Sequence, residues 1–225
     1  MSSLPVAPEI FAADGRRLGR RAQQTRLRLL DATAQLLRDQ GARDLRVVDV
    51  ARSVGTSPAT FYQYFRDVDE ALLALAEEAG AAVRPLAELV HQSWRGRVGL
   101  DAARILVDSY IAYWDRHRPV LTLRNVAAQD GDERFRAVRN GALSLITDPL
   151  SERIAEAQDE GQVGQEITPY AAAAAMVAML ERMAAYHTNL EPRGVNRDDM
   201  VETLARILFQ TVTGRRVGRP GSGTG

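Results

Sequence analysis

Apolar residues recur every three or four positions along most of this chain, which is the spacing of one face of an α-helix. The alternation of apolar and polar residues that is typical of β-strands is hard to find, and Ala, Leu, Arg and Glu dominate. The pattern therefore predicts an all-α protein of about nine helices.

The first third of the chain predicts one long helix followed by two short ones. The long helix covers residues 22–40, and Gly41 is a natural place for it to stop. The first short helix presents an apolar face made by Val47, Val50, Ala51 and Val54. After a turn at Gly55, the second runs from Pro58 to Phe65, with Ser57 as its N-cap.

The remaining helices are longer and carry clear start and stop signals. Asp67 and Glu70 form a capping box for the fourth helix, which we expect to continue with a kink at Pro85. Further helices are predicted over 100–116, ended by Pro119, then 120–129, 133–158 with an interruption near Pro149, 169–188 capped by Thr168, and 196–213 capped by Asn196.

The second short helix has two faces of different chemistry. Phe61 and Phe65 lie four residues apart and face inward. The outward face holds a small residue, a hydroxyl, an amide and two phenols, namely Ala59, Thr60, Gln63, Tyr62 and Tyr64. Such groups can contact base edges, thymine methyls and phosphates in a DNA major groove. The alternative is an ordinary helical hairpin with a polar surface.

The charge of the chain is unevenly distributed although its formal sum is zero. Residues 1–66 carry 11 Arg and 6 acidic residues, a net charge of +5, whereas the remaining 159 residues carry 18 Arg and 23 acidic residues, a net charge of −5. Six of the arginines lie in residues 16–28, a stretch without an acid. This stretch predicts an arm that lies on the phosphate backbone or enters a minor groove, and a solvated basic helix start is the alternative.

The sequence lacks the residue patterns that are typical of metal sites, phosphate-binding loops and catalytic centres. There is no Cys, and the three His residues are not at metal-ligand spacing, so we expect no metal site. No phosphate-binding glycine loop or nucleophile elbow is present, and Asp115 and His117 point to different faces of a helix. We therefore expect neither a cofactor nor enzyme activity. With no signal peptide and no apolar run of about 18 residues, we expect a cytoplasmic protein.

Residues 22–75 resemble the TetR family of bacterial transcriptional regulators. The resemblance rests on the helix that ends at Gly41, on the run from Val54 to Phe65 (VGTSPATFYQYF), and on the acidic helix start that follows. It implies a flexible arginine-rich arm (1–21), a three-helix helix-turn-helix domain (22–67), a helical effector-binding and dimerisation body (68–213) and a disordered tail (214–225).

The resemblance also assigns roles to residues of the DNA-binding domain. Pro58, Ala59, Thr60 and Gln63 match positions that approach bases, and Tyr62 and Tyr64 match positions that contact phosphates. Arg46 stands where a phosphate-binding Thr is common, and Val68 stands where Lys is usual. Arg66 or the arm can compensate for that lysine. The arm residues assigned to DNA are Arg16, Arg17, Arg20 and Arg21.

A TetR-like body implies a homodimer and an effector pocket. The last two long helices are expected to form the dimer interface, through Ala174, Val177, Leu204, Ile207 and Leu208. Aromatic and methionine side chains are the candidates for lining an apolar pocket, namely Trp94, Tyr110, Tyr113, Trp114, Phe135, Met176, Met179 and Met183. For each of them singly, plain core packing is the alternative.

These patterns together predict a ligand-responsive transcriptional regulator, more often a repressor. It would bind a palindromic DNA operator as a dimer and be released by a small, largely apolar effector. A DNA-binding regulator without a small-molecule ligand is the first alternative. A helical enzyme or scaffold whose arginine-rich start is incidental is the second.

Overall fold

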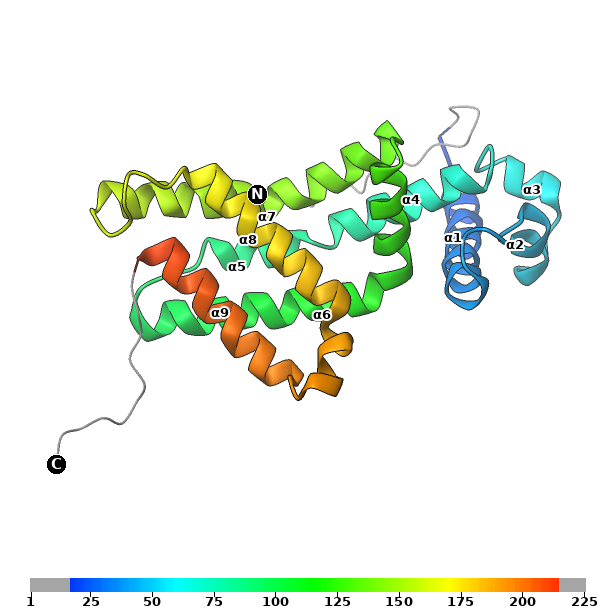
Figure 1. Cartoon of the computed structure of the whole chain (residues 1–225). Helices are drawn as coiled ribbons and strands as arrows, with labels where there is room; N and C mark the ends of the chain where they lie inside the picture. Colours follow the sequence, from blue (N-terminus) through cyan, green and yellow to red (C-terminus); the bar gives the residue numbers. More distant parts are fainter. Residues whose placement is uncertain (1–16, 215–225) are drawn as a thin grey trace. The chain divides into compact units, whose positions relative to one another are not determined.

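A computed structural model describes residues 17–214, and within them it forms nine α-helices and one 3-10 helix (Figure 1). The predicted all-α class is confirmed. None of the described helices is long and apolar enough to cross a membrane. Arg16, the rest of the expected arm before it and residues 215–225 of the expected tail lie outside the described residues. The elements are α1 (Arg20–Gln40), α2 (Val47–Ser53), α3 (Pro58–Tyr62), α4 (Val68–Ala81), α5 (Arg84–Val90), α6 (Gly96–Gln129), α7 (Glu133–Asp159), α8 (Pro169–Tyr186), η1 (His187–Arg193) and α9 (Arg197–Thr213).

The chain divides into two compact units. The first unit comprises Met1–Ala79 and Pro119–Arg136, and the second comprises Gly80–Arg118 and Ala137–Gly225. The boundaries fall inside α4, α6 and α7, so each of these helices contributes residues to both units. The division expected from the sequence, into an arm (1–21), a helix-turn-helix domain (22–67), a body (68–213) and a tail (214–225), stays a prediction.

Helix α1 begins earlier than its apolar pattern indicated. Arg20 and Arg21, expected in the arm, form its first turn. Its buried stripe consists of Leu29, Leu30, Thr33 and Leu37. Gly41 ends the helix at a φ of 78°, and its amide donates to the Leu37 carbonyl at 3.1 Å. A positive φ of this kind favours glycine, which explains the stop signal.

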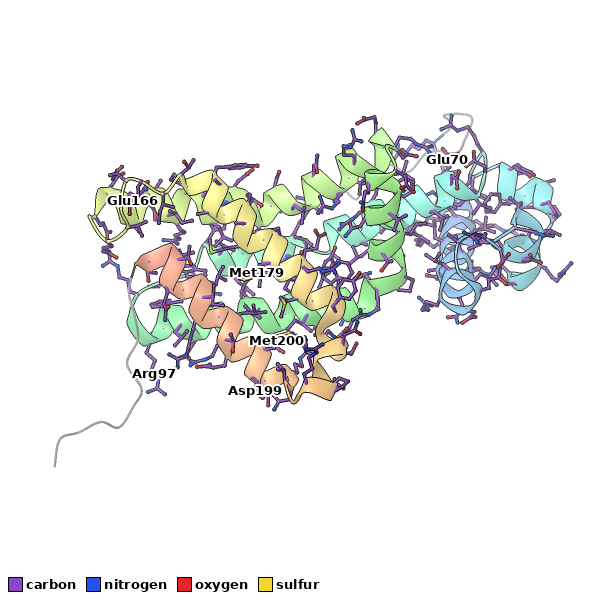
Figure 2. The ribbon with its side chains drawn as sticks, in the orientation of Figure 1. Glu70, Arg97, Glu166, Met179, Asp199 and Met200 are labelled. Carbon is purple, nitrogen blue, oxygen red and sulfur yellow. The ribbon has the colours of Figure 1, made fainter. Side chains whose placement is uncertain are left out.

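The predicted N-cap of α4 is present, but the reciprocal bond of the capping box goes to the residue before the cap. The Glu70 amide donates to Oδ1 of Asp67 at 2.8 Å, and the Glu70 carboxylate accepts from the Arg66 amide at 2.5 Å. Figure 2 labels Glu70 in this first turn. At its other end α4 stops at Ala81, and Pro85 lies in the first turn of α5. The expected kink at Pro85 is therefore a break between two helices, since proline is well tolerated in a first turn.

Two other prolines do not interrupt their helices, contrary to the sequence prediction. Pro119 lies inside the single helix α6, and Pro149 lies inside α7. An interior proline costs about 3 kcal/mol through a lost hydrogen bond and a clash. Leu121 and Leu150, which follow these prolines closely, are fully buried. Burying one such side chain recovers about 1.5–3 kcal/mol, so packing can hold both helices together.

A charged cluster in the second unit joins α6 to η1 and α9. Asp115 of α6 pairs with His187 at 2.7 Å, with Arg118 at 2.7 Å and with Arg197 at 3.3 Å. Burial raises the pKa of the Asp115 carboxyl, but the hydrogen bonds from His187 and Arg118 outweigh it, so the pKa lies below its ordinary value. Arg197 also reaches Asp108 at 2.8 Å. These pairs fix the start of α9 against α6.

A second cluster joins α6 to α9 through Glu202. Arg104 donates to both carboxylate oxygens, with Nε at 2.6 Å and Nη2 at 3.0 Å, and Arg206 donates at 2.5 Å. The hydrogen bond from Arg104 is the main reason that the pKa of Glu202 falls to about 2. This carboxylate is therefore charged at every pH at which the protein is normally handled.

Replacing Glu202 with Gln should destabilise the protein in a pH-dependent way. Because the folded pKa is depressed, the stabilisation is complete above the unfolded pKa of about 4.3 and is lost as the pH falls toward 2. The side chain is 40% exposed, so we expect about 1 kcal/mol near neutral pH after solvent screening. Urea unfolding of both proteins at pH 7 and at about pH 3 measures the difference. If the difference in the free energy of unfolding between the wild type and Glu202→Gln were the same at both pH values, the depressed pKa of Glu202 would be contradicted.

Candidate DNA interface and candidate effector site

Helix α3 is short, and two buried phenylalanines fix it in place. The Thr60 amide donates to Oγ of the N-cap Ser57 at 3.3 Å, and Pro58 occupies the first turn. Phe61 and Phe65 are 0% and 1% exposed, and their ring centroids lie 5.4 Å apart. The side chains on the opposite face are therefore presented from a rigid base.

The outward face of α3 contains most of the predicted residues. Pro58, Ala59 and Gln63 are exposed, and Tyr62 is 53% exposed with its ring edge-on to Phe61. Thr60 is half-buried, and its hydroxyl lies 3.2 Å from that of Ser57. We call the set Pro58, Ala59, Thr60, Tyr62 and Gln63 the α3 face.

Tyr64 does not belong to this face, which corrects the sequence prediction. It is only 9% exposed, and the helix ends two residues before it. The Tyr64 amide donates to the Phe61 carbonyl, three residues back, at 2.9 Å. Tyr64 lies three residues after the inward Phe61, so helical spacing already places it toward the side that Phe61 and Phe65 occupy.

The turn between α2 and α3 is held by contacts from α1. Gly55 has a φ of 70°, and the Thr56 amide donates to the Ala51 carbonyl at 2.9 Å. Arg28 donates to the Val54 carbonyl at 2.8 Å. Arg26 lies 5.0 Å above the ring of Phe65. Two arginines of the basic stretch thus stabilise the helix-turn-helix itself, a role that charge counting could not reveal.

The other predicted DNA-binding arginines lie on the surface. Arg17, Arg20, Arg21 and Arg46 are exposed, with Arg46 at the N-cap of α2. Arg66 is 73% exposed and pairs with Glu70 at 3.2 Å. A surface pair of this kind is weak, so Arg66 can exchange Glu70 for a phosphate.

The head of α4 has acidic rather than basic chemistry. Val68, at the position where the family usually has Lys, is half-buried, and Asp69 and Glu70 complete the first turn. Negative charge suits the positive end of a helix dipole, but it does not attract phosphate. Positive charge near this point therefore comes from Arg66.

The candidate effector residues are mostly buried in the second unit. Tyr110, Tyr113 and Trp114 of α6 and Met176 of α8 are at most 7% exposed. Met179 and Met183 are half-buried on α8, and Figure 2 labels Met179. The rings of Tyr110 and Tyr113 lie 5.8 Å apart, and Tyr113 and His117 lie 5.3 Å apart. Phe135 is buried too, but it belongs to the first unit.

The two tryptophans differ in how their indole N–H groups are used. Trp94 Nε1 donates to the Val90 carbonyl at 2.8 Å, at the end of α5. Arg153 donates to the same carbonyl at 3.3 Å and to that of His91 at 2.8 Å. Trp114 Nε1 is also buried, yet it has no hydrogen-bond partner among the described residues. Trp94 therefore has a structural role, whereas the N–H of Trp114 is available.

Replacing Trp94 with Phe should lower the free energy of unfolding by about 1–2 kcal/mol, through the lost hydrogen bond and a smaller ring. The Trp94 side chain is enclosed, because only 5% of the residue is exposed. Chemical denaturation monitored by circular dichroism measures the change. The Trp114→Phe variant is the matched comparison, because it removes an N–H without a partner. If both variants lost the same free energy of unfolding, the Trp94 hydrogen bond would not contribute to stability as we expect.

The predicted dimer residues do not all lie on the surface. Val177, Leu204 and Leu208 are at most 3% exposed within a single chain, so they pack in its own core and their assignment to the interface is corrected. Ala174 and Ile207 are exposed. The exposed residues on the same side of each helix are Ala171, Ala174 and Ala178 of α8, and Thr203, Ile207 and Gln210 of α9. We call these six residues the α8–α9 face.

The sequence missed most of this face because every position of α8 near Ala174 is apolar. The run from Ala171 to Met179 contains no polar residue, so periodicity cannot separate its buried side from its exposed side. In residues 17–214, no three His, Asp or Glu side chains come together as a metal site.

Family models match both parts of the chain. Residues 29–75 match the model described as bacterial regulatory proteins, tetR family, and residues 86–219 match the tetracyclin repressor-like C-terminal domain. A Haemophilus influenzae protein described as an uncharacterized HTH-type transcriptional regulator is 28% identical over 133 residues. That alignment covers 59% of this chain and 64% of the relative, less than two thirds of its length.

Two solved structures of similar fold are complexes with a ligand. The SmeT–triclosan complex has a TM-score of 0.62 and 17% identity, and the match covers 90% of this chain and 97% of that one. The Thermus thermophilus FadR repressor in complex with lauroyl-CoA has a TM-score of 0.53 and 21% identity, covering 88% and 100%. Together with the two family models, one of which spans more than half of the sequence, these findings show that the chain belongs to the TetR family of helix-turn-helix transcriptional regulators, which are not enzymes.

Proposed function

We propose that this protein is a ligand-responsive repressor that binds a palindromic operator as a homodimer and releases it when a small, largely apolar effector binds. The α3 face is the observation that carries the proposal. It presents small, amide and phenol groups from a helix that two buried phenylalanines hold in place. This is the chemistry and the rigidity that major-groove readout requires.

Each group of the interface has a separate role in the proposal. Pro58, Ala59, Thr60 and Gln63 approach base edges, and Tyr62 contacts a phosphate or a thymine methyl. Arg46 and Arg66 contact phosphates beside the groove, and the exposed arginines at the start of α1 extend these contacts. Phosphate contacts set affinity and register, whereas the α3 face sets the sequence preference.

The homodimer is supported by the α8–α9 face. Small side chains on α8 allow two helices to approach closely, and Ile207 on α9 leaves 41% of an apolar side chain in solvent. A two-fold interface that uses the same face of both subunits would bury these residues. It would also present two copies of α3 to a two-fold operator.

The effector is assigned to the second unit, where Tyr110, Tyr113, Trp114 and Met176 form an apolar and aromatic environment. Two TetR-like structures were solved with lauroyl-CoA and with triclosan, both of which carry large apolar parts. An effector acts only if it binds the DNA-free form more tightly than the DNA-bound form. The boundaries of the two units fall inside α4, α6 and α7, and we propose that these helices carry the coupling.

Selection of bound sequences from random duplex DNA, at fixed salt, tests the DNA-binding half of the proposal. We expect a palindrome with two half-sites about one helical turn apart. Lauroyl-CoA and triclosan are then titrated into the complex as probes, and release is followed by fluorescence anisotropy. Release by either probe supports the effector. A bound palindrome that neither probe releases would favour a regulator without a small-molecule ligand.

A further inference from the structure

The buried N–H of Trp114 is the strongest unexplained polar feature of the second unit. Trp114 is 2% exposed, and its Nε1 has no hydrogen-bond partner among the described residues. Buried polar groups nearly always have partners, so an exception needs a specific explanation. The comparison with Trp94 makes the exception clear, because that indole donates to a backbone carbonyl at 2.8 Å.

An internal water is a poor explanation for this donor. A buried water is held by about three hydrogen bonds, so it needs several polar groups around it. On the same face of α6 as Trp114, Ile111 and Val107 are fully buried and apolar. The polar neighbours on this face, Tyr110 and Arg118, lie four residues before and after Trp114 and already have partners of their own. One donor in such surroundings suits a ligand that brings one acceptor on an apolar framework.

The charges near Trp114 decide what kind of acceptor fits. Arg118, one turn along α6, donates to the Ala185 carbonyl and to Asp115. Asp115 itself is exposed beside Trp114 and carries a negative charge. Burial lowers the pKa of His117, so that its ring is neutral near pH 7. Arg116 is exposed and lies two residues from Trp114, on a different face of the helix, so it does not line this site. Because Arg118 already has partners and Asp115 is negative, a neutral oxygen suits this face of α6 better than a carboxylate.

We propose that Trp114 Nε1 is the specificity-determining donor of the effector site, and that the effector is an apolar molecule with a neutral carbonyl oxygen. A ketone, ester, thioester or amide supplies such an oxygen. The proposal rests on the effector role proposed above and narrows the class of ligand. It predicts selection against hydrocarbons of the same length, because they leave the indole N–H without a partner.

Two probes of equal chain length test this on the full-length protein. These are 2-undecanone, which has a carbonyl, and undecane, which has none. We expect the wild-type protein to bind the ketone more tightly than undecane. The Trp114→Phe substitution should lower the affinity for the ketone by about threefold to tenfold. Undecane affinity should stay within about twofold in that variant. Trp94→Phe is the matched control and should leave the preference for the ketone unchanged. Calorimetry or competition binding gives the affinities.

A spectroscopic measurement on the wild-type chain gives the same answer without relying on a variant. With two tryptophans, 15N-labelled protein has two indole signals, which the Trp114→Phe variant assigns. Binding of 2-undecanone should move the Trp114 indole proton downfield, and undecane should not. A water signal that remains close to this proton in both free and ketone-bound protein would overturn the proposal.

The outcomes separate this inference from the proposed function. If both probes bind equally and both release the operator, the effector site stands and the role of Trp114 is wrong. If Trp114→Phe weakens both probes to the same extent, the indole acts only through packing and the inference also fails. If neither probe binds while the palindrome is still recognised, both the inference and an apolar effector of this size are rejected.

Discussion

Replacing both Tyr62 and Gln63 with Ala should weaken operator binding by about 2–4 kcal/mol, or about 30-fold to 1,000-fold, with little change in the fold. Tyr62 is 53% exposed, and Gln63 is exposed at the C-cap of α3. Neither side chain holds α3 in place, because Phe61 and Phe65 provide its packing. The loss should therefore appear in DNA affinity and not in helix content.

Tyr62→Phe separates the two contributions of the tyrosine. If its hydroxyl contacts a phosphate, Tyr62→Phe should lose part of the affinity while the salt dependence of log K stays almost unchanged, because a neutral hydroxyl does not displace counterions. If the ring contacts a thymine methyl, the preference for that base should weaken only in Tyr62→Ala. Fluorescence anisotropy at several salt concentrations distinguishes these cases.

A matched control lies in the second unit. Gln92 is exposed between α5 and α6, so Gln92→Ala removes a comparable amide far from α3 along the chain. This variant should bind the operator like the wild type. Unchanged affinity in the Tyr62 and Gln63 double variant would remove the α3 face from the DNA interface, whereas a general loss of helix content would assign these residues a structural role.

The DNA-binding end was predictable from sequence because its signals are local. The N-cap at Ser57, the proline after it and the inward pair Phe61 and Phe65 each follow from neighbouring residues. Tyr64 shows where local reasoning stops. It lies three residues after the inward Phe61, at the border between the two faces of the helix, and the packing around it decides that it is buried.

The body was less predictable because its outcome depends on contacts between distant segments. Pro119 and Pro149 carry a helix-breaking signal, yet packing from elsewhere in the chain overrides it. On α8, burial divides an uninterrupted apolar run into Val177, which lies in the core, and Ala174, which lies on the surface. Similarly, the different hydrogen bonding of Trp94 and Trp114 could be seen only once α5 and α6 were placed.

The α8–α9 face supports the second large prediction, which concerns the dimer. Replacing Ala174 and Ile207 with Glu should convert the protein to a monomer at micromolar concentration. An isologous interface would then bury four carboxylates without partners, and burying even one such charge costs several kcal/mol. Both positions are exposed in a single chain, so the folded subunit should accept the changes. Sedimentation equilibrium and thermal unfolding measure the two outcomes.

DNA binding should follow the loss of the dimer. A monomer places one α3 in one half-site, so operator affinity should fall at least 100-fold, while a single half-site should bind both proteins alike. Val98→Glu is the control, because Val98 is 66% exposed on α6 and lies outside the α8–α9 face. That variant should remain dimeric and bind DNA normally. If Ala174→Glu with Ile207→Glu stays dimeric, the subunits must meet through another surface. If it becomes monomeric but retains full operator affinity, the two-fold account of DNA binding is wrong.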